Sequence, residues 1–298
     1  MSRATQVLDR QTTATRLLLA SAENSFDPTV ALDWAAEPVP GLAYAPLHRV
    51  SLYGTELWYG LSHAQRIELS KHEVGSIMQV GLWFELILMQ MLLRYAYDLD
   101  ARTAHAQYAL TEIGDETRHS VMFARAADKL GIPLYGPSRR LHNLARVYKA
   151  TAGGPAMFAP VLVAEEILDR LQREAMDDES VQPLIRDINR IHVIEESRHV
   201  RYARAELVRM MPRLGRAQLA RQRSLVATVS YLLAESLIDP KVYAAVGIEP
   251  ERGRRAALAN PHHQQSRRWM AGRIMPFLDE VGIVGGRSAA LYRKAHLV

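Results

Sequence analysis

Apolar residues recur at helical spacing along most of the chain, and glycine and proline mark the points where that pattern stops. A long apolar stretch begins after Ser62, which suits an N-cap, and runs to Leu99 with an expected break near Gly75. Thr103 caps the next predicted helix, which continues to about Leu130 and ends at GIPLYGP. No stretch has the alternation of a β-strand, so the pattern predicts an all-α fold.

The chain divides into an expected arm, a core and a C-terminal part. Residues 1–60 combine a short predicted helix over 13–23 with a proline-rich connection, which is typical of a wrapping arm. Further helices are predicted at about 139–150, 155–176, 180–211 and 216–236, followed by shorter helical pieces. We expect a single domain over 1–298, with a four-helix core at 62–211 and added C-terminal helices at 212–298.

Composition limits the chemistry that is open to this protein. The chain has 298 residues, of which 48% are hydrophobic, and it contains no cysteine. Its length and apolar content allow a large core. Without cysteine, the side chains left for a metal site are His, Asp and Glu. The N-terminal segment lacks the pattern of a secretory signal, so we expect a cytoplasmic protein.

Charge and hydropathy favour neither nucleic acid nor a membrane as a partner. The net charge of +5 comes mostly from arginines scattered along predicted helices, which is typical of a solvated surface. The apolar run 77–93 contains Gln79, Glu85 and Gln90, and we interpret it as a buried helix rather than a membrane span. The basic surface would suit an acidic carrier protein.

The nine residues EIGDETRHS, at positions 112–120, contain a Glu-x-x-His pair, Glu116 and His119. On a helix, this spacing projects both side chains to one face, where they can bind the same ion. One other Glu-x-x-His occurs, at Glu196 and His199, and the two segments read DETRH and EESRH. A repeat at 80 residues (196 − 116) predicts two helical hairpins of like construction.

Each hairpin is expected to supply one more carboxylate from its first helix. Glu85 lies 31 residues (116 − 85) before Glu116. The same interval before Glu196 leads to Glu165 and not to its neighbour Glu166. Two glutamates with two Glu-x-x-His pairs form the ligand pattern of di-iron and di-manganese helical bundles, so we expect a ferritin-like four-helix core.

Acids and arginines beside the motifs extend the predicted site. Asp115 and Glu195 precede the motif glutamates and share the histidine side of each helix. Each is expected to accept the outer N–H of a histidine, across the bundle, and so to fix its orientation. Arg118 and Arg198 are interpreted as structural partners of these two acids, which lie three residues before them.

One histidine breaks the repeat. His192 lies four residues before Glu196 and seven before His199, so the three share one stripe of a helix. The equivalent position of the first hairpin is Glu112. On spacing alone, His192 is either a metal ligand or a residue beyond the ligands.

The chain resembles the para-aminobenzoate N-oxygenase (AurF-like) family of ferritin-like di-iron proteins in its set of Glu85, Glu116-x-x-His119, Glu165 and His192-x-x-x-Glu196-x-x-His199. The extra histidine marks that family, and the resemblance covers at least residues 75–210. It implies that all seven side chains bind two iron ions, with manganese as the alternative. It further implies that dioxygen forms a peroxo intermediate that oxidises an aromatic amine to hydroxylamine, nitroso or nitro products, with an external electron donor.

Substrate and partners are less constrained by the sequence. Trp83, Phe84 and Leu88 are candidates for an apolar pocket wall, although the same residues also suit a buried core. The helix that carries Glu85 offers no arginine nearby for a substrate carboxylate. We expect a small-molecule amine, an electron-donor protein or reductant, and a homodimer.

Other functions share parts of this pattern. An acyl-carrier-protein desaturase also carries two such motifs, but it does not need His192. A ribonucleotide reductase small subunit needs a radical tyrosine near the iron, and the spacing of Tyr108 and Tyr202 on the ligand helices does not require that role. An iron-storage protein of ferritin type is usually shorter and more acidic, and an inactive scaffold that keeps the bundle is a further alternative.

Overall fold

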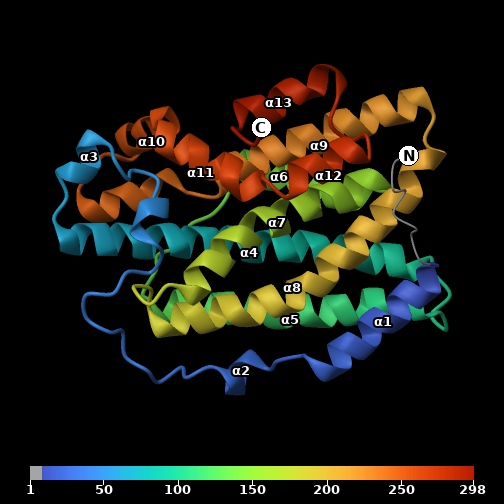
Figure 1. Ribbon diagram of the computed structural model, residues 1–298, viewed down its shortest axis with the longest axis horizontal. Coiled ribbons are helices and arrows are strands. Elements are labelled where there is room, and N and C mark those ends of the chain that lie inside the picture. The colour runs from blue at the N-terminus through green and yellow to red at the C-terminus, as the bar shows by residue number, and fades with distance from the viewer. Residues whose placement is uncertain (1–8) are drawn as a thin grey trace.

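The computed structural model describes residues 9–298, and these fold into helices without a β-strand (Figure 1). The predicted all-α fold is therefore confirmed. The first eight residues of the predicted arm lie outside the described part. The α-helices are α1 (Arg10–Glu23), α2 (Pro28–Ala31), α3 (Glu56–Tyr59), α4 (His63–Tyr97), α5 (Ala104–Lys129), α6 (Arg139–Thr151), α7 (Pro155–Asp177), α8 (Pro183–Met210), α9 (Arg216–Ser236), α10 (Pro250–Ala259), α11 (Pro261–Ala271), α12 (Ile274–Glu280) and α13 (Ala289–Lys294).

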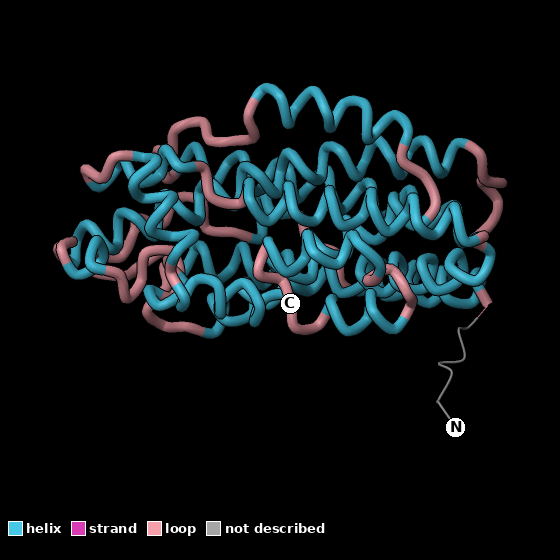
Figure 2. Tube along the Cα trace, turned by 90° about the horizontal axis from the view of Figure 1, so that it is seen from above, coloured by secondary structure: helices cyan, strands magenta, loops and turns pink. Residues whose placement is uncertain are grey.

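Four helices form the ferritin-like core as two hairpins. α4 packs along α5 and α7 packs along α8, and a short turn joins the helices of each pair. Figure 1 shows α4 and α5 running along the long axis of the molecule, with α7 and α8 inclined to them, and Figure 2 shows that long helices follow this axis. Ser62 forms a capping box with Gln65 at the start of α4, and Thr103 caps α5. Proline occupies the first position of both α7 and α8, where its missing N–H costs nothing.

The expected break near Gly75 is wrong, because α4 continues through this position without interruption. A Cβ atom on Gly75 would lie 2.6 Å from the Cγ2 atom of Ile132. Ile132 follows the end of α5, so the glycine lets the chain after α5 pack directly against α4. The residue serves close packing rather than helix termination.

The predicted start of the last core helix at Ser180 is also wrong by three residues. α8 begins at Pro183 with Gln182 as its N-cap. The Ser180 carbonyl accepts a hydrogen bond from the Ala43 N–H at 2.9 Å, and the Gln182 N–H donates to the Ala43 carbonyl at 2.8 Å. These bonds to the N-terminal arm keep residues 180–182 extended, so the helix cannot begin there.

Further helices cover the core on two sides. α1 packs against α5 and α8, and the segment after it runs past the core with α2 (Figure 1). On the other side, α9, α11 and α12 pack against α7, and α13 packs against α9 (Figure 1). The largest cluster of buried apolar side chains joins this layer to α4, α7 and α8. The site-bearing helices are therefore enclosed.

Within the described residues, α4 is the helix whose length and composition would allow it to cross a membrane. Its most apolar window has a mean hydropathy of 1.6, and 56% of that window is buried inside the protein. Glu85 and His72, both in this helix, are buried among other parts of the chain. The position of α4 in the core agrees with the interpretation of 77–93 as a buried helix.

Candidate metal centre

The four core helices bring seven predicted side chains together at the middle of the bundle. Each of them is at most 5% exposed to solvent, which leaves water unable to stabilise their charges. They are Glu85 from α4, Glu116 and His119 from α5, Glu165 from α7, and His192, Glu196 and His199 from α8.

The two motif glutamates lie between the two motif histidines. The His199 Nδ1 atom is 3.1 Å from a Glu116 oxygen and 2.8 Å from a Glu196 oxygen. The His119 Nδ1 atom is 3.3 Å from a Glu116 oxygen and 3.4 Å from a Glu196 oxygen. Both glutamates therefore face both histidines, which is the arrangement expected of carboxylates shared by two ions.

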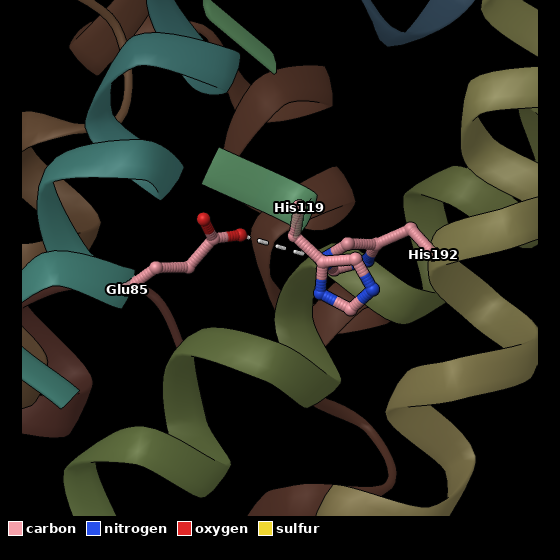
Figure 3. A group of neighbouring side chains, drawn as sticks. All are labelled: Glu85, His119 and His192. Carbon is pink, nitrogen blue, oxygen red and sulfur yellow. Dashed lines mark ion pairs between the residues drawn. The ribbon is translucent and has the colours of Figure 1, made fainter. Parts of the chain in front are cut away.

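Glu85, His119 and His192 converge at one end of this group (Figure 3). One potential ligand atom from each lies within 4.8 Å of those of the other two. The His192 Nε2 atom is 3.7 Å from the Glu85 carboxylate, while its Nδ1 atom is 2.9 Å from the Gln172 side-chain oxygen. The Ser120 hydroxyl donates to Glu85 at 2.8 Å. Gln172 thus fixes the tautomer that leaves Nε2 free to face the centre.

Glu165 and its neighbour Glu166 face different parts of the protein. Glu165 groups with His192 and Glu196, with one potential ligand atom from each within 4.8 Å of the others. Glu166 instead accepts a hydrogen bond from the Nε atom of Arg204 at 2.7 Å and forms an ion pair with that residue. The 31-residue interval therefore selects the glutamate that faces the centre.

Burial and mutual repulsion decide which of these groups hold protons. Burial raises the pKa of Glu165 well above its usual value, and the nearby Glu196 and Glu116 carboxylates raise it further. Burial disfavours a charged imidazole, but the carboxylates of Glu116, Glu195 and Glu196 hold the pKa of His119 well above its ordinary value. The centre is thus built for positive charge, which protons or metal cations can supply.

Acids outside this group hold the far side of each histidine. The His119 Nε2 atom is 2.7 Å from Glu195, and the His199 Nε2 atom is 3.2 Å from Asp115. Each contact joins α5 to α8 across the bundle, in the sense predicted from the sequence. An Nε2–H that donates to a carboxylate leaves Nδ1 as the metal-binding nitrogen.

Two arginines balance these acids. Arg118 forms an ion pair with Asp115. Arg198 lies 3.3 Å from Asp115 and 3.8 Å from Glu195, so it contacts both acids rather than only the one three residues before it. Because Arg198 is only 5% exposed, its charge needs these two carboxylates.

The N-terminal arm contributes two contacts that sequence reasoning missed. The backbone N–H of Phe26 donates to Glu195 at 2.9 Å, and the Arg198 guanidinium donates to the Asn24 carbonyl at 3.0 Å. Because every residue except proline has a backbone N–H, the sequence does not reveal which one donates this hydrogen bond. The segment that follows α1 therefore helps to orient the carboxylate that orients His119.

The family model described as p-aminobenzoate N-oxygenase AurF matches residues 7–282. The chain belongs to this family. The AurF family is one of di-iron oxygenases. The match extends beyond the metal-facing helices and includes α9 to α12, while α13 lies outside it.

Two mycobacterial relatives are also similar to this AurF-family chain. Uncharacterized protein Rv0885 of Mycobacterium tuberculosis and Uncharacterized protein Mb0909 of Mycobacterium bovis are each 29% identical to it over 205 residues. The aligned part covers 66% of this chain and 60% of each relative. The chain thus matches less than two thirds of the length of these relatives.

A small cavity adjoins one end of this AurF-family centre. Glu85, Glu165 and His192 form its polar part, and Phe84, Phe123 and Leu168 are among its apolar lining residues. Trp83 and Phe84 line a second, almost entirely apolar cavity that reaches α6 and α9. Leu88, the third candidate for a pocket wall, is buried in the main core and lines neither cavity.

Sequence reasoning also passed over Glu112 as a metal-facing residue. It is 2% exposed, and one of its carboxylate oxygens lies within 4.8 Å of potential ligand atoms of Glu116 and His199. Burial raises the pKa of Glu112 well above its usual value, although the neighbouring His199 opposes that shift. The sequence feature that could have identified Glu112 as metal-facing is its distance of 80 residues from His192 (192 − 112), the same interval that relates the two motifs.

Proposed function

We propose that the protein uses a pair of iron ions and dioxygen to N-oxygenate an aromatic amine. The observation that carries the proposal is the convergence of Glu85, His119 and His192 beside two shared carboxylates, in a chain of the AurF family. Carboxylate and imidazole donors without thiolate suit non-haem iron, with manganese as an alternative occupant. Four buried carboxylates without cations would repel one another strongly.

The residues divide into shared and terminal ligands. Glu116 and Glu196 would bridge the ions, because each faces both His119 and His199. The remaining five predicted ligands would each bind one ion; these are Glu85, His119, Glu165, His192 and His199. When bound, the iron pair would supply the electrons and the Lewis acidity that activate dioxygen.

The protein's own contribution is orientation and exclusion of water. Asp115 and Glu195 hold the two motif histidines with Nδ1 toward the centre. The small cavity measures about 10 Å³, so its apolar lining, including Phe84 and Phe123, would keep bulk water away from the centre and would have to move apart to admit an aromatic ring.

The charges beyond this cavity favour an amine that lacks a free carboxylate. A neighbouring cavity shares Leu237 with the first and is lined by Arg49 and Arg267. The Arg49 Nε donates to Glu174 at 2.7 Å, and Arg267 donates to Glu235 at 2.8 Å. Because both guanidinium groups are already balanced by glutamates, a substrate carboxylate would gain little from them.

The test is anaerobic loading of the whole chain with ferrous ion, followed by dioxygen and a panel of arylamines. We expect two ions per chain and conversion of amine to hydroxylamine, nitroso or nitro products, measured by mass spectrometry. Uncharged anilines and aminobenzamides should be better substrates than aminobenzoates. Uptake of one ion or none would overturn the proposal. Turnover of acyl-carrier-protein substrates with no amine product would replace it with the desaturase alternative.

The electron donor, an acidic carrier partner, a cytoplasmic location and a homodimer stay predictions. The basic surface motivates only the carrier, because net charge steers association without fixing a partner. The two ferrous ions would supply the two electrons for one oxidation of amine to hydroxylamine per centre, so the iron count and this first product depend on none of the four, and further turnover needs an added reductant.

A further inference from the structure

A buried glutamate outside the seven predicted ligands faces the same centre. Glu112 lies on α5 one turn before Glu116, and only 2% of it is exposed. Its Oε2 atom is buried and has no hydrogen-bond partner among residues 9–298. One of its oxygens lies within 4.8 Å of potential ligand atoms of Glu116 and His199. A carboxylate left in this state is costly, so the site is one that a cation would stabilise.

The repeat gives Glu112 a definite counterpart. Glu112 and His192 are 80 residues apart (192 − 112), the interval that also relates His119 to His199. His192 of α8 approaches His119 of α5, with ring centroids 4.7 Å apart, at the end where Glu85 lies. Glu112 of α5 approaches His199 of α8 in the corresponding way. The two hairpins thus present one extra donor to each end of the centre, a nitrogen at one and an oxygen at the other.

The two donors also differ in what holds them. The outer nitrogen of His192 lies 2.9 Å from Gln172, whose counterpart in the first hairpin is the apolar Leu92. Glu112 has Tyr108 one turn before it, and the Tyr108 hydroxyl is itself buried without a hydrogen-bond partner in the described part of the chain. No described side chain donates a hydrogen bond to the Glu112 Oε2 atom. Two further potential metal ligands, Glu116 and His199, lie beside Glu112, so a metal ion is the partner that this position suits.

We propose that Glu112 is an eighth protein ligand, bound to the ion that also takes His199 and Glu116. This inference rests on the proposed iron pair. The two ions would then differ in one donor, because the Glu112 carboxylate stands at one ion where the other has the imidazole of His192. An ion with an added hard, anionic oxygen donor favours the higher oxidation state.

The experiment compares Glu112→Gln with His192→Gln and with the unchanged protein. Ferrous ion is titrated anaerobically, bound iron is counted, and Mössbauer spectra resolve the two ions. In Glu112→Gln we expect one ion to bind at least about tenfold more weakly while the other is retained. Its spectrum should lose or shift one doublet, and His192→Gln should affect the other doublet. Glu166→Gln, which removes a buried acid that faces Arg204, is the control and should keep both ions.

A second variant guards against a merely structural effect. Glu112→His gives α5 the donor that α8 carries, so it should restore two tightly bound ions with two more similar doublets. If Glu112→Gln binds two ions with unchanged affinity and unchanged doublets, Glu112 is not a ligand, although the iron pair stands. If the unchanged protein binds no iron pair, the proposed function and this inference both fail.

Discussion

The two helical hairpins of the core, α4–α5 and α7–α8, are built on one plan and differ at a few positions. In both, the first helix supplies one glutamate, and the second supplies an acid, a glutamate and a histidine at the same spacing. The 80-residue interval holds for every one of these residues: Glu85 and Glu165, Asp115 and Glu195, Glu116 and Glu196, His119 and His199. Shared positions therefore define where two ions would lie.

The positions that differ make the two ends of the centre chemically unequal. Glu112 stands where the second hairpin has His192, and Ser120, which donates to Glu85, stands where it has Val200. Glu165 consequently lacks the hydroxyl donor that Glu85 has from α5. A symmetric scaffold thus carries an asymmetric ligand set, which is suited to two ions with different tasks.

The strongest test of the shared plan is loss of either bridging glutamate. Glu116→Ala and Glu196→Ala should each weaken binding of both ions by more than about 100-fold, because each carboxylate faces both motif histidines. Bound iron, counted after removal of free metal, should fall from two ions to nearly none in both variants. Retention of one tight ion in either variant would show that this glutamate is not shared and would break the equivalence of the hairpins.

A buried acid with no counterpart in the second hairpin provides the next test. Glu73 lies in α4, and the equivalent position, Gly153, precedes α7. Burial raises the pKa of Glu73 to about 7, against the opposing hydrogen bonds from Ser51. The folded state thus holds the proton more tightly than the unfolded state. Its contribution to stability is complete below the unfolded pKa of 4.5 and is lost as pH rises through about 7.

Glu73→Gln should remove this pH dependence. As pH rises from about 5 to about 8, the unfolding free energy of the metal-free protein should fall. The fall should be about 2 to 3 kcal/mol larger in the unchanged protein than in Glu73→Gln. Urea unfolding at several pH values, with the exposed Glu251→Gln as control, measures this difference. Equal slopes in the variant and the unchanged protein would mean that the pKa of Glu73 is the same in the folded and unfolded states.

The sequence predicted the positions that helical periodicity controls. Glu165 faces the centre and Glu166 turns to Arg204, as the 31-residue interval requires, because a rotation of 100° per residue separates neighbours on a helix. Helix bounds were also predicted closely where a capping residue or a proline next to the helix end sets them, as at Thr103 before α5 and Pro155 at the start of α7. Glu112 shared the repeat interval, but an acid in a charged helix resembles a solvated residue until burial is known.

What the sequence could not predict depends on contacts between distant segments. Ser180 fails as a helix start because the backbone of Ala43 pairs with it, and any residue can form such bonds. Gly75 looked like a helix breaker, and only the side chain of Ile132 explains it. The Phe26 N–H that holds Glu195 is likewise independent of side-chain identity.

The smallest expected effect concerns the serine that only one hairpin has. The Ser120 hydroxyl donates to Glu85 at 2.8 Å, and burial already raises the pKa of Glu85. Ser120→Ala removes a hydrogen bond to a carboxylate, worth about 1 to 2 kcal/mol, so the ion at Glu85 should bind about 5- to 30-fold more weakly. The loss should grow as pH falls, because a proton then competes with the ion for Glu85.

Val200→Ala is the matched change in the second hairpin. Val200 is apolar and packs against the main core, so its truncation should leave affinity at both ions within about twofold at every pH. Titration of ferrous ion at several pH values distinguishes the two variants. If Ser120→Ala leaves binding unchanged, or if Val200→Ala has the same pH-dependent effect, the hydroxyl does not distinguish the two ends. The asymmetry of the centre would then rest on Glu112 and His192, since these are the remaining unlike pair that faces the ions.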